Sequence, residues 1–302
     1  MPSESRGPAL ASIAYAWRTD MAARTRWRHT RLTGRNPLAI VVLLLFAVFF
    51  GLPMLWLLLA TTKTAHQLVD TNPLSFGSWH TLKENWDALI RYQDGAVFLW
   101  LRNSVVYAFV ALAITLSVSI PAGYALAMTD FPGRRTLLAT TLVVLVMPST
   151  TLVVPLFLEI NAVHLIGSMW SIILPFSFYP FGVYLAYVYF NTAIPRSLLE
   201  AARLDGCTEF GAFRRVVLPL ATPVIALVGF FSFTADWTNY FLPYVLLPQS
   251  TQLPIQVGLG YISAGRPELA LATVLAITPI LVVFVFSQRF LITGMLAGAA
   301  KD

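Results

Sequence analysis

The chain has 302 residues, of which 57% are hydrophobic and only 11% are charged, and its mean hydropathy is +0.72. Soluble globular domains contain about 25% charged residues, so this composition excludes an ordinary soluble protein and predicts that a bilayer solvates much of the chain. The net charge of +6 at pH 7 does not indicate a nucleic-acid-binding protein, because the basic residues follow a membrane topology.

The N-terminal segment, residues 1–37, contains seven arginines and precedes the first apolar run. It is too long and too rich in arginine for the charged part of a signal peptide, and no small-residue cleavage pattern follows the apolar run. We therefore expect a cytoplasmic tail followed by a retained membrane anchor. The arginines either lie on anionic lipid headgroups or belong to a disordered segment.

Six segments are apolar and long enough to cross a bilayer, for which a helix needs about 20 residues. They are residues 38–60, 103–128, 137–158, 169–190, 221–242 and 269–292. Several contain internal prolines, which membrane helices accept because neighbouring groups satisfy the freed carbonyls. The pattern predicts an all-α polytopic membrane protein in which residues 38–302 form one transmembrane domain.

The basic residues divide unequally between the two sides of the predicted spans. Fifteen of the 20 lysines and arginines fall in the tail, in the second and fourth connections and near the C-terminus, and five lie on the other side. By the positive-inside rule both termini are cytoplasmic. Residues 61–102 then form an extracytoplasmic segment, with Trp79 and Trp86 suited to the membrane interface. The single cysteine, Cys207, excludes an intrachain disulfide and a thiol-based metal cluster.

The fourth connection, residues 191–219, is a long cytoplasmic excursion that carries helix signals. The run LLEAARLD favours a helix. Gly206 stands where such a helix would end, because glycine adopts a positive φ at low cost. Thr208 is placed to cap a second helix that leads towards the fifth span. The connection therefore predicts two short helical arms joined by a glycine.

The first arm has a composition suited to docking. Ala201 and Ala202 have short side chains that let the backbone of a partner protein approach closely. The alternative is a local ion pair between Glu200 and Arg203 at i, i+3 on a solvated helix.

The string EAARLDG, residues 200–206, followed by CTEFGAFRRVVLP, resembles the EAA loop of binding-protein-dependent ABC importer permeases. The similarity extends over residues 38–302, where LRNSVVYAFVALAITLSVSIPAGYALAMTDFPGRR and MPSTTLVVPLF resemble the carbohydrate-uptake type, which includes maltose and glycerol 3-phosphate permeases. The resemblance implies a type I ABC importer permease domain with 191–219 as its coupling loop. It also implies import of a sugar or related solute across the cytoplasmic membrane of a prokaryote.

The same resemblance implies partners and a coupling site. The partners are a second permease subunit, two ATP-binding subunits and an extracytoplasmic solute-binding protein, with membrane lipids around the spans and no nucleic acid. The chain itself would bind no cofactor, since ATP and Mg would bind to the ATP-binding subunits and no GxxxxGKS/T loop occurs in this sequence. The residues that would contact an ATP-binding subunit are Leu199, Glu200, Ala201, Ala202, Asp205 and Gly206.

Polar side chains within the predicted spans mark either a solute path or an interhelical contact. The candidates for a path are Ser177, Tyr184, Asp236, Asn239 and Tyr240. Asp236 would either line an aqueous path or face the extracytoplasmic surface near the end of its span. In the resembled family this region usually reads Trp, Asn, an acidic residue and Phe, whereas here the acidic residue precedes Trp237. No metal site is expected.

Two other function classes require different features. An ion-coupled secondary transporter requires inverted repeats and ionisable groups near the bilayer midplane, which the sequence does not show clearly. An intramembrane enzyme requires a nucleophile or a metal-binding constellation within the spans, and all four histidines lie outside them. We therefore expect a permease subunit that is not an enzyme, with a non-sugar solute as the main alternative cargo.

Overall fold

The structure is a computed structural model that describes residues 37–299, so the predicted tail 1–37 lies outside the described residues except for Pro37. All regular elements are helices, and no strand occurs among the described residues, in agreement with the predicted all-α fold. The described residues divide into two units, residues 37–55 and residues 56–299. Helix α2, Pro37–Ala60, begins in the first unit, and its side chains up to Leu55 are exposed, as suits a helix surrounded by lipid tails.

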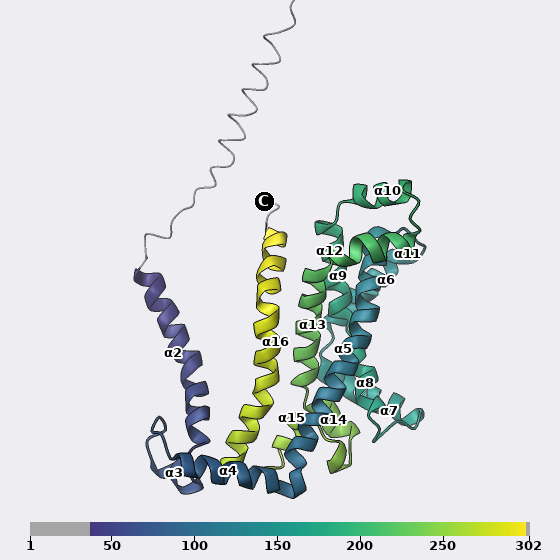
Figure 1. Ribbon diagram of the computed structural model, residues 1–302. Helices are drawn as coiled ribbons and strands as arrows, with labels where there is room; N and C mark the ends of the chain where they lie inside the picture. Colours follow the sequence, from purple (N-terminus) through teal and green to yellow (C-terminus); the bar gives the residue numbers. More distant parts are fainter. Residues whose placement is uncertain (1–36, 300–302) are drawn as a thin grey trace, which may run out of the picture. The chain divides into compact units, whose positions relative to one another are not determined.

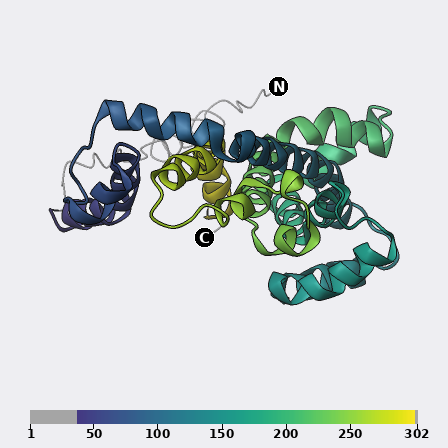
Figure 2. The same cartoon turned by 90° about the horizontal axis from the view of Figure 1, so that it is seen from below.

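The second unit is built on apolar helices that Figure 1 shows from the side. α5 spans Ala96–Met128, α13 spans Thr222–Trp237 and α16 spans Pro267–Ala299. A further span consists of α8, Trp170–Ser177, followed by α9, Pro180–Ala193. In the view from below (Figure 2), α5, α9 and α13 pack against one another, and α16 packs against α13.

By length and apolar composition the described helices provide four membrane spans, or six if each of two bent helix pairs counts as one span. The predicted six-span membrane architecture agrees with this finding. The orientation of the termini stays a prediction. The second predicted span, 103–128, begins seven residues earlier in the structure, because α5 continues out of the apolar region to Ala96.

The third predicted span, 137–158, is not one helix. α6, Arg134–Val146, is followed by a bend of 100° and then by a short 3-10 helix, Ser149–Leu152, and α7, Val153–Ala162. Met147 has extended backbone angles, φ −71° and ψ 126°, because the ring of Pro148 disfavours a helical residue before it. Pro148 also lacks the N–H that would continue the helix.

The fifth predicted span, 221–242, is shorter in the structure and is bent at its start. α13 stops at Trp237, and α14, Phe241–Leu246, follows after a break. The backbone N–H of Leu242 donates to Oδ1 of Asn239 at 3.2 Å, so a side chain replaces a helical carbonyl at this break. At its other end α13 turns by 76° from the segment Glu209–Leu220.

The end of the unit opposite to residues 191–219 carries a folded segment around a buried lysine. It contains α3, Ala65–Asp70, α4, Trp79–Arg91, and a 3-10 turn, Tyr92–Gly95, that leads into α5. Lys63 is only 2% exposed, and its Nζ donates to the carbonyl oxygens of Asn72 at 2.6 Å and Pro73 at 3.3 Å. Nδ2 of Asn85 on α4 donates to the carbonyls of Thr61 and Lys63, both at 2.9 Å. The bonds of Asn85 tie α4 to the residues that directly follow α2.

A second connection packs at the same end. It contains a 3-10 turn, Ser250–Gln252, and α15, Ile255–Leu259, which lies against α5. Nδ2 of Asn103 on α5 donates to the carbonyl oxygen of Thr251 at 2.8 Å, and Nε1 of Trp100 donates to that of Ser250 at 3.0 Å. Trp100 and Asn103, near the start of α5, thus donate hydrogen bonds to backbone carbonyl groups of this loop.

The second unit has two hydrophobic cores. The first core lies at the α4 end and includes Trp100, Ile172, Phe233 and Leu246. The second core lies at the α10 end and joins the rest of α5 to α9, to the start of α13 and to the 191–219 connection; it includes Tyr124, Phe190, Leu199, Phe213 and Val217. A Cβ added to Gly123 of α5 would overlap with Ala186 of α9, so a missing side chain allows these two helices to pack closely.

Candidate functional site

The 191–219 connection forms two short helices with a sharp reversal between them. α10 spans Arg196–Leu204, α11 spans Glu209–Ala212, and a π-helical turn, Phe213–Val217, and α12, Leu218–Leu220, lead into α13. Both arms lie at one end of the bundle in Figure 1. The two-arm prediction is confirmed.

A glycine ends the first arm. The N–H of Cys207 donates to the carbonyl of Ala202, and the N–H of Gly206 donates to that of Arg203, both at 3.0 Å, which is the Schellman pattern. Gly206 has φ +82°, as predicted, and no atom lies near the place of its missing side chain. Oγ1 of Thr208 accepts a hydrogen bond of 3.1 Å from the N–H of Gly211, so the predicted cap of the second arm also forms.

The structure divides the six predicted coupling residues into two groups. Leu199 and Ala202 are buried in the second core, where they hold α10 against the bundle. The residues that face outwards are Glu200, Ala201, Asp205 and Gly206. Two apolar side chains of the connection are also strongly exposed, Leu204 on α10 at 90% and Phe210 on α11 at 69%. Neither of them is among the six predicted coupling residues.

Arg203 connects the two arms instead of pairing within α10. Its Nε and Nη2 atoms donate to Oε1 and Oε2 of Glu209 at 2.7 Å and 3.1 Å. The local pair with Glu200 is therefore not the arrangement found, and Glu200 stays open to a partner. Through the same side-chain hydrogen bond, Glu209 raises the pKa of Arg203, and Arg203 lowers the pKa of Glu209.

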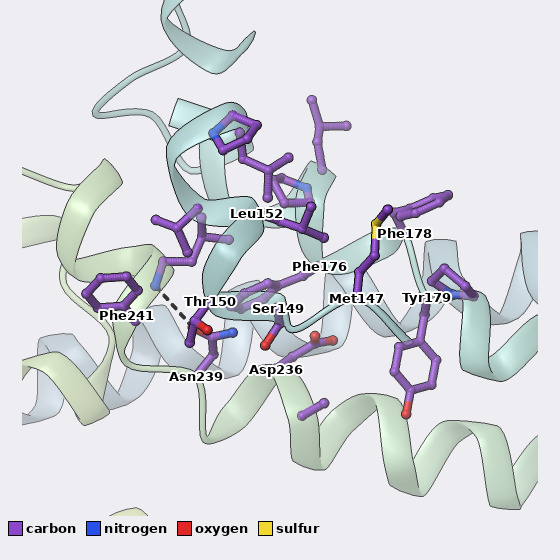
Figure 3. A pocket seen from close by; sticks show the side chains of 18 of the residues that line it. Met147, Ser149, Thr150, Leu152, Phe176, Phe178, Tyr179, Asp236, Asn239 and Phe241 are labelled. Carbon is purple, nitrogen blue, oxygen red and sulfur yellow. Dashed lines mark hydrogen bonds between the residues drawn. The ribbon is translucent and has the colours of Figure 1, made fainter. Parts of the chain in front are cut away.

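A cavity of about 930 Å³ lies where several helices are interrupted (Figure 3). One wall comes from the break at Met147 and from Ser149, and another from Phe178 and Tyr179, which precede Pro180. Tyr179 has φ −124° and ψ 80°, again a non-helical residue before a proline. Non-helical backbone at membrane depth is tolerated where it lines a cavity. The cavity therefore accounts for the two helix breaks, and the residues at the breaks form part of its wall.

Three of the five predicted path residues line this cavity: Asp236, Asn239 and Tyr240. Ser177 lines a second, smaller cavity of about 240 Å³ that shares Phe178 and Tyr179 with the first. Tyr184 lines neither cavity, and its ring stacks on Tyr187 with the centroids 6.4 Å apart.

Sequence reasoning missed the cavity residues that the two breaks supply, above all Ser149, Thr150 and Tyr179. The available signal was the proline that follows each break, at positions 148 and 180. Membrane helices often continue through a proline, so this signal alone did not predict a broken span. Within residues 37–299 no group of three or more histidine, cysteine, aspartate or glutamate side chains is placed to hold a metal ion.

Comparison with known proteins gives a family match over more than half of the chain. The family described as "Binding-protein-dependent transport system inner membrane component" matches residues 119–296. These residues include α8, α9, both arms of the 191–219 connection, α13 and most of α16.

Two curated relatives are similar over nearly their whole length. The arabinooligosaccharides transport system permease protein AraQ of Bacillus subtilis (strain 168) is 29% identical over 271 residues, which cover 85% of this chain and 93% of that protein. The sulfoquinovosyl glycerol transport system permease protein SmoH of Agrobacterium fabrum (strain C58 / ATCC 33970) is 32% identical over 271 residues, which cover 88% of this chain and 94% of that protein.

A solved structure has the same fold. It is a chain of a bacterial ABC transporter involved in the import of the acidic polysaccharide alginate. The TM-score is 0.73, with 21% sequence identity, over 87% of this chain and 97% of that chain. The overall arrangement of the helices is therefore one already observed by crystallography.

Proposed function

The chain belongs to the family of binding-protein-dependent transport system inner membrane components, as an ABC importer permease subunit of a prokaryotic cytoplasmic membrane, and we propose that its solute is a carbohydrate. The support for this cargo is that similar permeases are named for arabinooligosaccharides, sulfoquinovosyl glycerol and diacetylchitobiose. These proteins are 28–32% identical to the chain and are covered over most of their length.

The outward face of α10 is the proposed contact with an ATP-binding subunit. Leu204 at the end of α10 and Phe210 on α11 expose apolar area, and Glu200 of α10 has no ion pair within the described residues. An exposed apolar patch with an unpaired charge beside it is typical of a protein interface. Leu199 and Ala202 anchor the back of the same helix in the second core, so a force on the face would reach α13 through the π-helical turn. The main support for the coupling proposal is that one side of α10 is buried in the second core while the other side is exposed.

The cavity is the proposed contribution of this subunit to the solute path. A second permease would supply the facing wall, and an extracytoplasmic solute-binding protein would deliver the solute. Two ATP-binding subunits would hold ATP and Mg, while this chain would bind neither. In this arrangement the chain has no catalytic residue, and its task is to convert movement of α10 into opening and closing of the cavity.

Co-expression with the partner subunits tests the coupling proposal. Glu200→Lys is expected to lower solute-stimulated ATP hydrolysis of the purified complex by tenfold or more, since one hot-spot charge at an interface is typically worth about 2 kcal/mol. The matched control is Glu84→Lys, an exposed carboxylate on α4 at the opposite end. If both variants assemble and hydrolyse ATP like the unchanged complex, α10 is not the docking helix.

The cargo proposal has its own test. Solute-stimulated ATP hydrolysis of the unchanged complex in proteoliposomes is measured with a panel of mono- and oligosaccharides and with amino acids and short peptides. Stimulation by at least one carbohydrate supports the proposal. Stimulation confined to amino acids or peptides refutes it and leaves the family assignment intact.

A further inference from the structure

The cavity of about 930 Å³ has acidic but no basic side chains among its described lining residues. Two carboxyl-bearing residues line it, Asp236 and Glu159. The hydroxyl- and amide-bearing residues of the lining are Ser149, Thr150, Tyr179, Asn239 and Tyr240. No lysine, arginine or histidine is among the described residues that line it. An anion in this cavity would meet no fixed positive charge from this subunit.

Asp236 is the buried carboxyl group of the lining. It is 8% exposed, and Figure 3 shows its carboxyl group at the cavity wall beside Ser149. Its one hydrogen bond within the described residues is accepted from Oγ of Ser232 at 3.4 Å, which is long for such a bond. A carboxylate has about four acceptor positions, so most of the acceptor capacity of Asp236 is open to the cavity. Glu159 adds a second carboxyl group at the exposed edge.

A solute that leaves water needs protein groups that replace its hydration. The hydroxyl groups of a solute find such protein groups in this cavity. They can donate to the carboxyl oxygens of Asp236 and accept from the hydroxyl and amide groups of the lining. Hydroxyl groups can do so whether or not the carboxyl group carries its proton, because at least one of its oxygens remains an acceptor. A carboxylate or sulfonate has no proton to donate to an acceptor, and it meets another acidic group where it needs a cation.

We infer that this subunit's half of the solute path favours uncharged, hydroxyl-rich solutes over anionic ones, with Asp236 as a specificity-determining residue. The inference rests on the proposed function, because it applies only if the cavity is the solute path. Two similar proteins are named for other solutes, one for the acidic polysaccharide alginate and one for sulfoquinovosyl glycerol, so the inference predicts a preference that need not be shared across the relatives.

The charge preference of the cavity can be measured without knowing the solute. The chain has a single cysteine, so Ser149→Cys combined with Cys207→Ser leaves one thiol in this chain, at the cavity wall, and labelling is followed on this subunit. The complete transporter, reconstituted with its partner subunits, is treated with a cationic trimethylammonium-ethyl methanethiosulfonate and with an anionic sulfonatoethyl methanethiosulfonate. Each rate is divided by the rate of the same reagent with a free thiol. Ser250→Cys, at an exposed loop position, serves as the matched control.

The cationic reagent is expected to react about tenfold faster at position 149 after this normalisation, because a cleft lined by one sign of charge concentrates the opposite sign by 10-fold or more. Asp236→Asn should lower that ratio at least about threefold, whereas Glu84→Gln, outside the cavity, should leave it unchanged. The control position should show a smaller ratio that does not respond to Asp236→Asn.

Three outcomes overturn the inference. Equal normalised rates at position 149 refute the charge preference and leave the path proposal intact, because both reagents reached the cavity. A high ratio that Asp236→Asn does not change removes Asp236 as the determinant. No reaction with either reagent refutes the path proposal itself, and the inference falls with it.

Discussion

The guanidinium group of Arg196, the first residue of α10, donates a hydrogen bond of 3.3 Å to the carbonyl oxygen of Ala127 near the end of α5. Arg134 approaches the same helix end: its Nε donates to the carbonyl of Leu126 at 2.7 Å, and its Nη2 donates to that of Ala127 at 3.4 Å. The last carbonyls of a helix lack intrahelical partners and carry partial negative charge. Two arginines thus cap α5, and one of them belongs to the proposed docking helix.

Arg196→Ala is expected to weaken coupling more than stability. Arg134 still caps α5 in this variant, so the helix end keeps donors, but α10 loses its direct bond to α5. We expect solute-stimulated ATP hydrolysis to fall several-fold while the thermal midpoint of the complex changes little. Arg135→Ala, on the adjacent α6 residue, is the control, and an equal loss in both variants would show that general positive charge, not the bond to Ala127, is responsible.

The positive φ of Gly206 predicts a specific cost for any side chain at this position. Gly206→Ala places an L-residue in the left-handed region, which costs about 1–2 kcal/mol, although the surrounding space is open. Gly133 is a matched control, since it has φ +87° and equally open space in the loop before α6. Both variants should lower the thermal midpoint to a similar degree. Only Gly206→Ala should also lower solute-stimulated ATP hydrolysis, and identical activity profiles would contradict a coupling role.

The bond between Arg203 and Glu209 predicts a charge-reversal rescue. Arg203→Glu and Glu209→Arg should each reduce coupling, because two like charges then face each other across the turn at Gly206. The double variant should recover most of the loss, since it restores an ion pair. A double variant as defective as the worse single one would show that each side chain acts on the partner subunit separately.

The same pair gives a direction for pH dependence. Arg203 lowers the pKa of Glu209 from its ordinary value of 4.5, so the folded loop stabilises the ionised carboxylate. The stabilisation is fully present above about pH 4.5 and is lost as the pH falls through the lower folded-state pKa. Hydrogen exchange of the amides of α11 should therefore accelerate in acid in the unchanged chain, and the pH dependence should be weaker in Arg203→Gln. Equal acid sensitivity in both would contradict the assignment.

Lys63 predicts a local loss of order when its charge is removed. Lys63→Met keeps the length of the side chain but removes the donor to the carbonyls of Asn72 and Pro73, and a hydrogen bond from a charged group typically contributes about 1.5–3 kcal/mol. Limited proteolysis in the segment 61–78 should be faster in this variant. The Lys83→Met variant, which changes an exposed lysine on α4, should be cut at the same rate as the unchanged chain. Equal protection of both variants would refute the role of Lys63.

Much of the fold was predictable because its determinants are local. A run of about 20 apolar residues specifies a span, and Gly206 with Thr208 specifies the turn between α10 and α11. These signals lie within one segment of the sequence, so the helices, the two arms and the reversal of the connection were found without the structure.

The cavity was not predictable in full because its determinants come from distant segments. Pro148 and Pro180 each interrupt a helix, but the sequence does not show that the two interruptions meet around Asp236. For the same reason Tyr184 was grouped with the path residues, although its ring packs on Tyr187 of its own helix. The pairing of Arg203 with Glu209 was missed because a nearer partner, Glu200, was available at i, i+3.

The region between the two hydrophobic cores carries hydroxyl groups. Thr115 and Ser119 of α5 and Ser232 of α13 are buried there, and Oγ1 of Thr115 donates to the carbonyl of Ser177 at 3.2 Å. Among the described helices, α5, α13 and α16 pass this region unbroken, whereas α8 and α9 are separated by Phe178 and Tyr179. Small side chains interlock less than leucine or phenylalanine, so we expect this layer to resist tilting less than either core does.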